Sequence, residues 1–123
     1  MNIGIKVGDV MTRLFVSVSP SMSLAKCSKE MINKKVGSLL VIENNQLKGI
    51  ITEGDIIRAI AKCKNLSKLK VGNAMTKKVV SIAPSEDIYN AILRMRKYKI
   101  RWLPVTIKKR VIGLLTEKDI LVI

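Results

Sequence analysis

Two short segments of this sequence place a threonine three residues before an aspartate. They are GIITEGD (49–55), with Thr52 and Asp55, and GLLTEKD (113–119), with Thr116 and Asp119. Such a pair can cap a helix, because the hydroxyl and the carboxylate each accept a backbone N–H of the other residue. A carboxylate there can equally accept both hydroxyls of a ribose, while the threonine and free N–H groups face a phosphate or ribose oxygen. The residue types leave both roles open.

Catalytic chemistry has little support in the composition. The chain has no histidine, which removes the commonest general base and the commonest metal ligand. The two cysteines, Cys27 and Cys63, form no CxxC spacing and fall at helix-type apolar positions, so we expect buried free thiols. Neither a phosphate-binding loop nor a dinucleotide fingerprint is present. We therefore expect no enzyme, no catalytic residues, no metal and no cofactor.

The charge points to anionic partners. A net charge of +14 is large for 123 residues, and much of it lies in the second half. One interpretation is a solvated face; the other is a surface that binds nucleic acid through its phosphates. The low aromatic content, 3%, disfavours base stacking. The basic residues concerned are Lys77, Lys78, Arg94, Arg96, Lys97, Lys99, Arg101, Lys108, Lys109 and Arg110.

Location is predicted by default. No apolar run approaches the roughly 18 residues of a membrane span, and the first residues lack the apolar core of a signal peptide. We expect a cytoplasmic protein without a membrane partner.

An internal repeat organises the chain. The two segments lie 64 positions apart, and the same offset relates Lys6-Val7-Gly8 to Lys70-Val71-Gly72 and Met11-Thr12 to Met75-Thr76. A fixed period indicates one supersecondary unit written twice. Two copies of about 60 residues would each be marginal alone, so we expect one domain of residues 1–123 with internal pseudo-two-fold symmetry. The copies are assigned to 6–64 and 65–123.

The elements follow from periodicity. Each copy is predicted to run β-α-β-β-α. In the first copy we expect a strand at 14–18, a helix from Leu24 to about Lys35, a hairpin of 39–42 and 47–51, and a helix from Thr52 to about Cys63. Pro104 predicts an edge or strand-start position in the second hairpin. The last helix is cut to about two turns, and 65–69 connects the copies.

The doubling, the Met-Thr lead-ins and the Gly-x-x-Thr-x-x-Asp segments together resemble the cystathionine-β-synthase (CBS) domain. Two tandem copies are similar to a CBS pair, or Bateman module, over nearly the whole chain. The resemblance implies a mixed α/β (α+β) fold and clefts between the two motifs. It implies that these clefts bind adenosine-containing ligands such as AMP, ADP, ATP or S-adenosylmethionine. It also implies frequent homodimers, although the short last helix departs from the usual dimer-forming pattern.

The resemblance also implies the residues that line each cleft beside its threonine and aspartate. Valine and isoleucine side chains would hold the adenine, with backbone groups reading its edge; ordinary core packing is the alternative. The expected residues are Val16, Ser17, Val36, Gly37 and Ser38 in the first copy, and Val80, Ser81, Ile100, Arg101 and Trp102 in the second.

Arg101 and Trp102 predict that the two clefts differ. Arg101 matches a position where the family places phosphate-binding residues, and it is expected to face the Asp55 cleft; its counterpart is Gly37. The resemblance therefore implies that the Asp55 cleft takes the more phosphorylated ligand. Trp102 would stack on a base or fill its cleft. The alternative for Arg101 is a solvated surface charge.

Three functions remain open at this stage. The first is a regulatory module that senses an adenine nucleotide and controls an unidentified partner protein by its preference for one state. The second is a nucleic-acid-binding protein that uses the basic second copy. The third is a structural adaptor with empty clefts.

Overall fold

The computed structural model describes residues 1–62 and 65–123, and these divide into two compact units. Unit 1 consists of Met1–Phe15 and Val80–Ile123, and unit 2 of Val16–Val79. The boundaries 6–64 and 65–123 describe the sequence repeat, whereas each unit contains the lead-in segment of the other copy. The fold is mixed α+β, as predicted.

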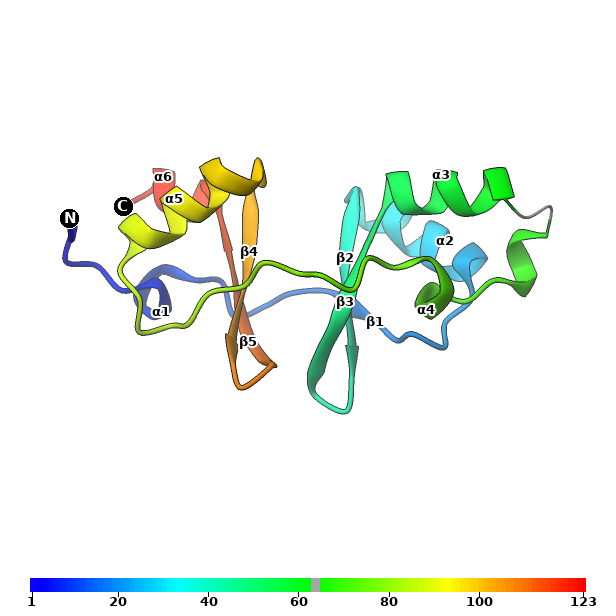
Figure 1. Cartoon of the computed structure of the whole chain (residues 1–123), viewed down its shortest axis with the longest axis horizontal. Coiled ribbons are helices and arrows are strands. Elements are labelled where there is room, and N and C mark those ends of the chain that lie inside the picture. Colours follow the sequence, from blue (N-terminus) through cyan, green and yellow to red (C-terminus); the bar gives the residue numbers. More distant parts are fainter. Residues whose placement is uncertain (63–64) are drawn as a thin grey trace. The chain divides into compact units, whose positions relative to one another are not determined.

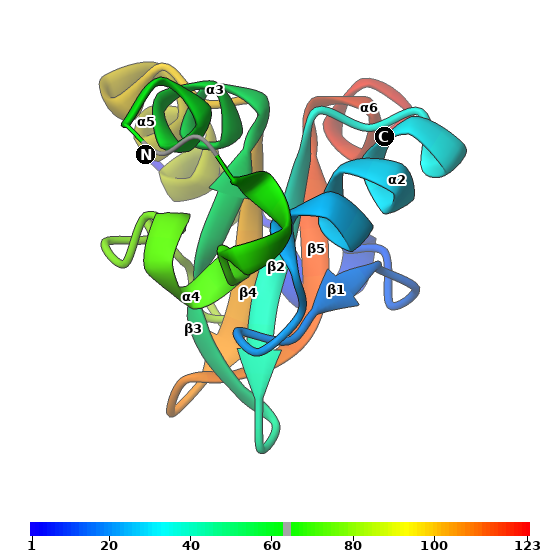
Figure 2. The ribbon, with the colours of Figure 1, turned by 90° about the vertical axis from the view of Figure 1, so that its right-hand side faces the viewer.

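Unit 2 is built on a hairpin of β2 (Ser38–Glu43) and β3 (Gln46–Thr52), visible in Figure 1. The two-residue strand β1 (Ser17–Val18) runs parallel to β2, beside which it lies in Figure 2. Its helical elements are α2 (Leu24–Lys34), α3 (Glu53–Lys62), the 3-10 turn η1 (Leu66–Lys68) and α4 (Val71–Ala74).

Unit 1 repeats this order with a weaker first strand. It contains α1 (Val7–Val10), α5 (Ile88–Tyr98), β4 (Trp102–Ile107), β5 (Arg110–Thr116) and α6 (Glu117–Leu121). The predicted strand is reduced here to one parallel bridge between Ile82 and Val105. Pro104 has no backbone N–H to donate, but its carbonyl accepts the N–H of Ile82 at 3.0 Å.

The predicted strand at 14–18 is too long. Only Ser17 and Val18 pair with β2, while the side chain of Leu14 is 88% exposed. Alternation and β-branching favoured a strand there, but a strand also needs a neighbour for its backbone groups. The predicted helix from Leu24 and both hairpins are confirmed.

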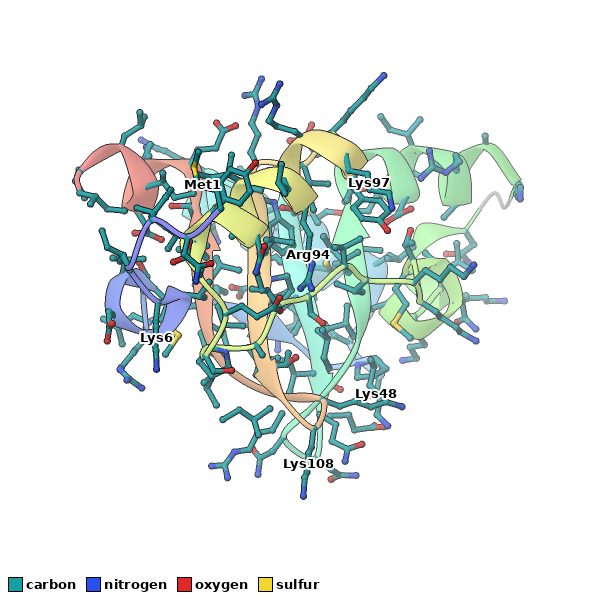
Figure 3. The ribbon with its side chains drawn as sticks, turned by 60° about the vertical axis from the view of Figure 1, so that its left-hand side comes forward. Met1, Lys6, Lys48, Arg94, Lys97 and Lys108 are labelled. Atoms are coloured by element: carbon teal, nitrogen blue, oxygen red, sulfur yellow. The ribbon has the colours of Figure 1, made fainter. Side chains whose placement is uncertain are left out.

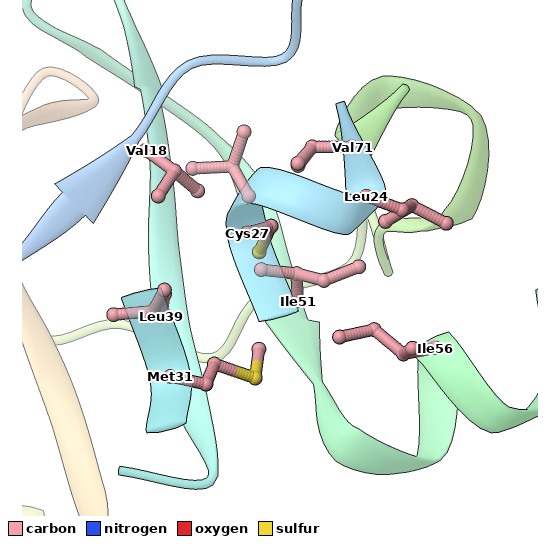
Figure 4. Close-up of a cluster of buried hydrophobic side chains, with 9 residues drawn as sticks. Val18, Leu24, Cys27, Met31, Leu39, Ile51, Ile56 and Val71 are labelled. Atoms are coloured by element: carbon pink, nitrogen blue, oxygen red, sulfur yellow. The ribbon is translucent and has the colours of Figure 1, made fainter. Parts of the chain in front are cut away.

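Each unit has its own apolar core. In unit 2, α2 contributes Leu24, Cys27 and Met31, which pack against Leu39 and Ile51 of the hairpin (Figure 4). In unit 1 the corresponding residues of α5 are Ile88, Ala91 and Met95. The spacing of three and four residues puts these side chains on one helix face. Burial raises the pKa of the Cys27 thiol, as expected for an inert core cysteine; Cys63 lies outside the described residues.

The lead-in segments are attached by backbone hydrogen bonds. In unit 2, the N–H of Val71 donates to the carbonyl of Met22 at 2.8 Å, and Thr76 pairs with Ile50 in both directions at 2.8 and 2.9 Å. In unit 1, Thr12 pairs with Leu114 in the same way, at 2.8 Å both ways. Each lead-in threonine is thereby held beside the hairpin that carries an aspartate motif.

Asp87 starts α5 and holds the N-terminal residues. Its carboxylate accepts the backbone N–H of Tyr89 at 2.9 Å, of Ile3 at 3.0 Å and of Gly4 at 2.8 Å. The hydrogen bond from Ile3 is the main cause of a lowered Asp87 pKa, because it favours the charged carboxylate.

The two hairpin turns differ in strain. Asn44 and Asn45 have φ values of 53° and 62°, and Lys108 and Lys109 have 49° and 68°. Asparagine tolerates this left-handed region, whereas a lysine in this conformation destabilises the fold by about 1 kcal/mol or more. The unit 1 turn is therefore less stable than its sequence counterpart.

Replacing Lys108 by Asn and Lys109 by Gly together is expected to stabilise the protein by about 1–2 kcal/mol, because the new residues favour positive φ. Urea unfolding measures the change. The control K108Q/K109Q removes the same two charges but leaves the strain, so its gain should be much smaller. An equal gain in both variants would assign the effect to charge.

Candidate functional site

Asp55 is the buried carboxylate of unit 2. It lies in the first turn of α3 and is only 5% exposed. The N–H of Thr52 donates to Asp55 Oδ2 at 3.0 Å, and the N–H of Asp55 donates to Thr52 Oγ1 at 3.1 Å. The predicted capping pair is confirmed in this copy. The cap fixes the carboxylate at the junction of β3 and α3.

Two further side chains bind the other oxygen of Asp55. Arg58 Nη2 donates to Oδ1 at 2.6 Å, and the hydroxyl of Thr76 donates to the same atom at 3.1 Å. Thr76 belongs to the lead-in of the second sequence copy. The carboxylate of one copy is thus completed by a residue of the other within a single compact unit.

Asp119 holds the equivalent place in unit 1 with a different set of partners. The N–H of Thr116 donates to Oδ2 at 2.9 Å, the hydroxyl of Thr116 lies 3.1 Å from that oxygen, and Thr12 donates to Oδ1 at 3.0 Å. The N–H of Asp119 donates back to Thr116 Oγ1 at 3.3 Å. Within the described part of the chain Asp119 forms no ion pair, and Val122 stands where Arg58 stands in the first copy.

The segment before β2 lies against the Asp55 junction. The carbonyl of Gly37 accepts the N–H of Glu53 at 3.0 Å, and Ser38 is paired with Thr52 across the hairpin. Val36 is 38% exposed. Ser17 pairs with Leu40, two residues further along β2, and Val16 precedes it with 40% exposure. The structure therefore brings Gly37, Ser38, Thr52 and Asp55 together directly, with Val16 and Ser17 one strand away.

The second copy repeats this arrangement. The carbonyl of Arg101 accepts the N–H of Glu117 at 3.0 Å, and Trp102 is paired with Thr116. The side chain of Arg101 is exposed and that of Trp102 half-buried, as are Val80, Ser81 and Ile100. The carbonyl of Ser81 already accepts Arg94 Nη1 at 2.8 Å.

A groove of about 490 Å³ adjoins the segment before β2 in unit 2. It is lined by α2, the following segment and α3, including Ile32, Val36, Gly37, Glu53 and Ile57. Val36 and Gly37 are shared with the predicted site, but Thr52 and Asp55 do not line the groove. The groove and the Asp55 carboxylate are therefore distinct features.

Three residues were not among the predicted site residues. Thr12 and Thr76 recur at the repeat offset, and that recurrence is the one feature that could have marked them. Arg58 does not recur, because position 122 is valine, so the repeat carries no sign of it. The local signal that could have marked it is the helical i, i+3 spacing from Asp55 to Arg58.

Two further properties concern the described residues alone. Across 1–62 and 65–123, no three His, Cys, Asp or Glu side chains gather as metal ligands would. No described helix is both long and apolar enough to cross a membrane.

Comparison with known proteins identifies the family. The CBS domain model matches residues 7–62 and 71–123, so the chain belongs to the CBS domain family, with two tandem copies. It is 37% identical over 117 residues to a homoserine O-acetyltransferase of Methanococcoides burtonii, covering 93% of this chain and 23% of that protein. The chain spans only 21% to 24% of the length of the homoserine O-acetyltransferases with which it was compared.

Two solved structures share the fold and contain adenosine ligands. CBSX2 in complex with AMP superimposes with a TM-score of 0.82 at 29% identity, covering 96% of this chain and 94% of that one. The CBS domain pair of MJ0100, in complex with 5′-methylthioadenosine and S-adenosyl-L-methionine, gives 0.75 at 27% identity, with 94% and 95% covered.

Proposed function

We propose that the protein is a regulatory module that binds an adenosine-containing ligand and controls a partner protein. The observation that carries this proposal is the buried Asp55 carboxylate, held at a strand–helix junction beside Thr52, Gly37 and Ser38. A carboxylate fixed in this way can accept both hydroxyls of a ribose. The AMP in CBSX2 and the adenosine derivatives in MJ0100 support this ligand class.

Each unit contributes one site in this proposal. In unit 2, Asp55 binds the ribose, Thr52 faces a phosphate or ribose oxygen, and Val16, Ser17 and Val36 flank the adenine. In unit 1, Asp119 and Thr116 take these roles, with Val80, Ser81, Ile100 and Trp102 around the base, while Arg101 is a candidate phosphate contact. AMP, ADP, ATP and S-adenosylmethionine share the adenosine group that these residues would recognise.

Regulation follows from differential binding. Ribose hydroxyls that reach Asp55 join a carboxylate that also accepts the hydroxyl of Thr76, from the lead-in of the second copy. A ligand that binds one arrangement of these contacts more tightly shifts the protein toward it. A partner that distinguishes the arrangements would then respond to the nucleotide.

A homodimer is part of the proposal. Ile32 is 74% exposed on α2, and Ile57 and Ile60 are 65% and 50% exposed on α3. Burial of such side chains contributes about 25 cal/mol for each Å² of apolar surface. A second copy of this chain that covers these helices would remove that surface from water.

A thermal-shift panel with AMP, ADP, ATP, S-adenosylmethionine and a short DNA duplex, at low and high salt, tests the function. A ligand at 100 times its Kd adds about 2.7 kcal/mol of stability, which should raise the Tm by several degrees. We expect at least one adenosine ligand to give a shift that survives high salt. The proposal fails if none of them stabilises the protein.

Nucleic acid is the second candidate partner, favoured by the net charge of +14. Lys97 on α5 and Lys108 at the turn of the unit 1 hairpin carry exposed ammonium groups (Figure 3). Contacts of this type depend steeply on salt because they release counterions. In the same panel, a shift with the duplex alone, lost at high salt, would favour this function over nucleotide binding.

A further inference from the structure

Arg58 is the one cation paired with Asp55 in the described chain, and it has no counterpart in the second copy. We propose that Arg58 makes the Asp55 site selective for phosphorylated adenosine ligands: it leaves Asp55 to the ribose and pairs with the phosphate. The inference rests on the proposed function and names the class of ligand for one of the two sites.

The carboxylate of Asp55 has little free capacity. An ionised carboxylate offers about four lone-pair positions, two on each oxygen. Oδ1 already accepts Arg58 and Thr76, and Oδ2 accepts the N–H of Thr52. A ribose that donates one hydroxyl to each oxygen therefore needs a partner of Oδ1 to leave.

Arg58 is the partner that can leave. The N–H of Thr52 belongs to the backbone where β3 meets α3, and Thr76 is held by its two backbone hydrogen bonds to Ile50. The side chain of Arg58 is 66% exposed, while that of Asp55 is 4% exposed. A long, largely solvated side chain can rotate away without disturbing the backbone of either partner.

The charge of the ligand then determines its affinity for the Asp55 site. Neutral adenosine would separate the Arg58–Asp55 ion pair and offer the guanidinium no new anion. A phosphorylated ligand would bring an anion into the same site, and guanidinium groups bind phosphate through paired N–H donors. S-adenosylmethionine instead places a positive sulfonium on the 5′-carbon, where AMP has its phosphate, and its one carboxylate lies at the far end of the methionine chain. The site should therefore rank AMP above adenosine and S-adenosylmethionine.

The guanidinium of Arg58 lies close to Gly54. A Cβ built on Gly54 would stand 3.3 Å from Arg58 Nη1, so a side chain there would displace the guanidinium only slightly. The second copy has Lys118 and Val122 at the two equivalent positions, and Asp119 forms no ion pair within the described residues. Phosphate selection through this residue is thus confined to the Asp55 site.

The experiment compares AMP and adenosine by titration calorimetry on the full chain, in an Asp119→Asn background that leaves the Asp55 site to be measured. Arg58→Met is expected to weaken AMP binding about tenfold or more, and to leave adenosine binding equal or tighter. Lys62→Met is the matched control, because it removes one positive charge from the same helix away from Asp55. It should leave the ratio of the two affinities unchanged.

Arg58→Lys guards against a folding defect, since it keeps a charge at this position and should retain part of the preference for AMP. Equal weakening of AMP and adenosine in Arg58→Met would show that Arg58 merely holds Asp55, and would overturn the inference. If Arg58→Met changes neither the AMP affinity nor the adenosine affinity, the inference is overturned as well. In both cases the proposed function stands. If the wild-type chain binds neither ligand, the inference fails, while the thermal-shift panel with all the adenosine ligands decides the proposed function separately.

Discussion

Asp55→Ala is expected to abolish adenosine-ligand binding in unit 2 and to destabilise the protein by about 3 kcal/mol. The substitution removes the helix cap, commonly worth about 1 kcal/mol, and leaves the N–H of Thr52 and the hydroxyl of Thr76 without their acceptor. Urea unfolding measures the stability, and titration calorimetry measures the binding. The loss of stability is expected to be this large because the Asp55 side chain is buried, with only 5% exposed.

Thr76→Val separates the two effects. It removes the hydroxyl that donates to Asp55 Oδ1 but keeps the carboxylate, so we expect about 1 kcal/mol of lost stability with binding retained. Asp119→Ala should cost less stability than Asp55→Ala, because Asp119 is more exposed and is not tied to an arginine. Full ligand affinity in Asp55→Ala, with Asp119 also replaced, would contradict the ribose role.

Gly49→Ala is expected to destabilise the protein by about 3 kcal/mol, at the upper end for overpacking. A Cβ at Gly49 would stand 2.6 Å from the carbonyl oxygen of Thr76 and 2.9 Å from Met75 Sδ. That carbonyl accepts the N–H of Ile50 at 2.9 Å, so it cannot withdraw without breaking the attachment of the lead-in. Urea unfolding gives the change in free energy.

Gly113→Ala is the matched control in unit 1. The nearest atom there is Met11 Sδ at 2.6 Å, on a side chain that can rotate, while the carbonyl oxygen of Thr12 is further away at 3.1 Å. The cost should therefore be clearly smaller than at Gly49. Equal costs in the two variants would mean that backbone proximity is not what requires glycine at Gly49.

Local elements were largely predictable from the sequence. The helix of Leu24–Lys34 follows from apolar residues on one face, and Ser23 caps it by accepting the N–H of Lys26 at 3.1 Å. The turn at Asn44 and Asn45 follows from the tolerance of asparagine for positive φ. Both capping pairs followed from a threonine three residues before an aspartate. These features depend on residues close in sequence.

Parts of the site could not be predicted in this way. The ion pair of Arg58 with Asp55 has the helical i, i+3 spacing, but it is absent from the second copy, so the repeat does not mark it. The strand at Ser17–Val18 is short because only those residues pair with β2. The expected role of Arg101 toward the Asp55 site, and that of Trp102 as a stacking or filling residue, stay predictions.

The repeat in the sequence establishes that one supersecondary unit occurs twice and that each copy carries a carboxylate at a helix start. Which lead-in completes which carboxylate becomes clear in the folded chain, where Thr76 contacts Asp55 and Thr12 contacts Asp119. The physical reason is that local spacing encodes helices, strands and turns, while these contacts join segments far apart in the chain. Because the two lead-ins have nearly the same sequence, the repeat alone could not distinguish exchange of the lead-ins from attachment of each to its own copy.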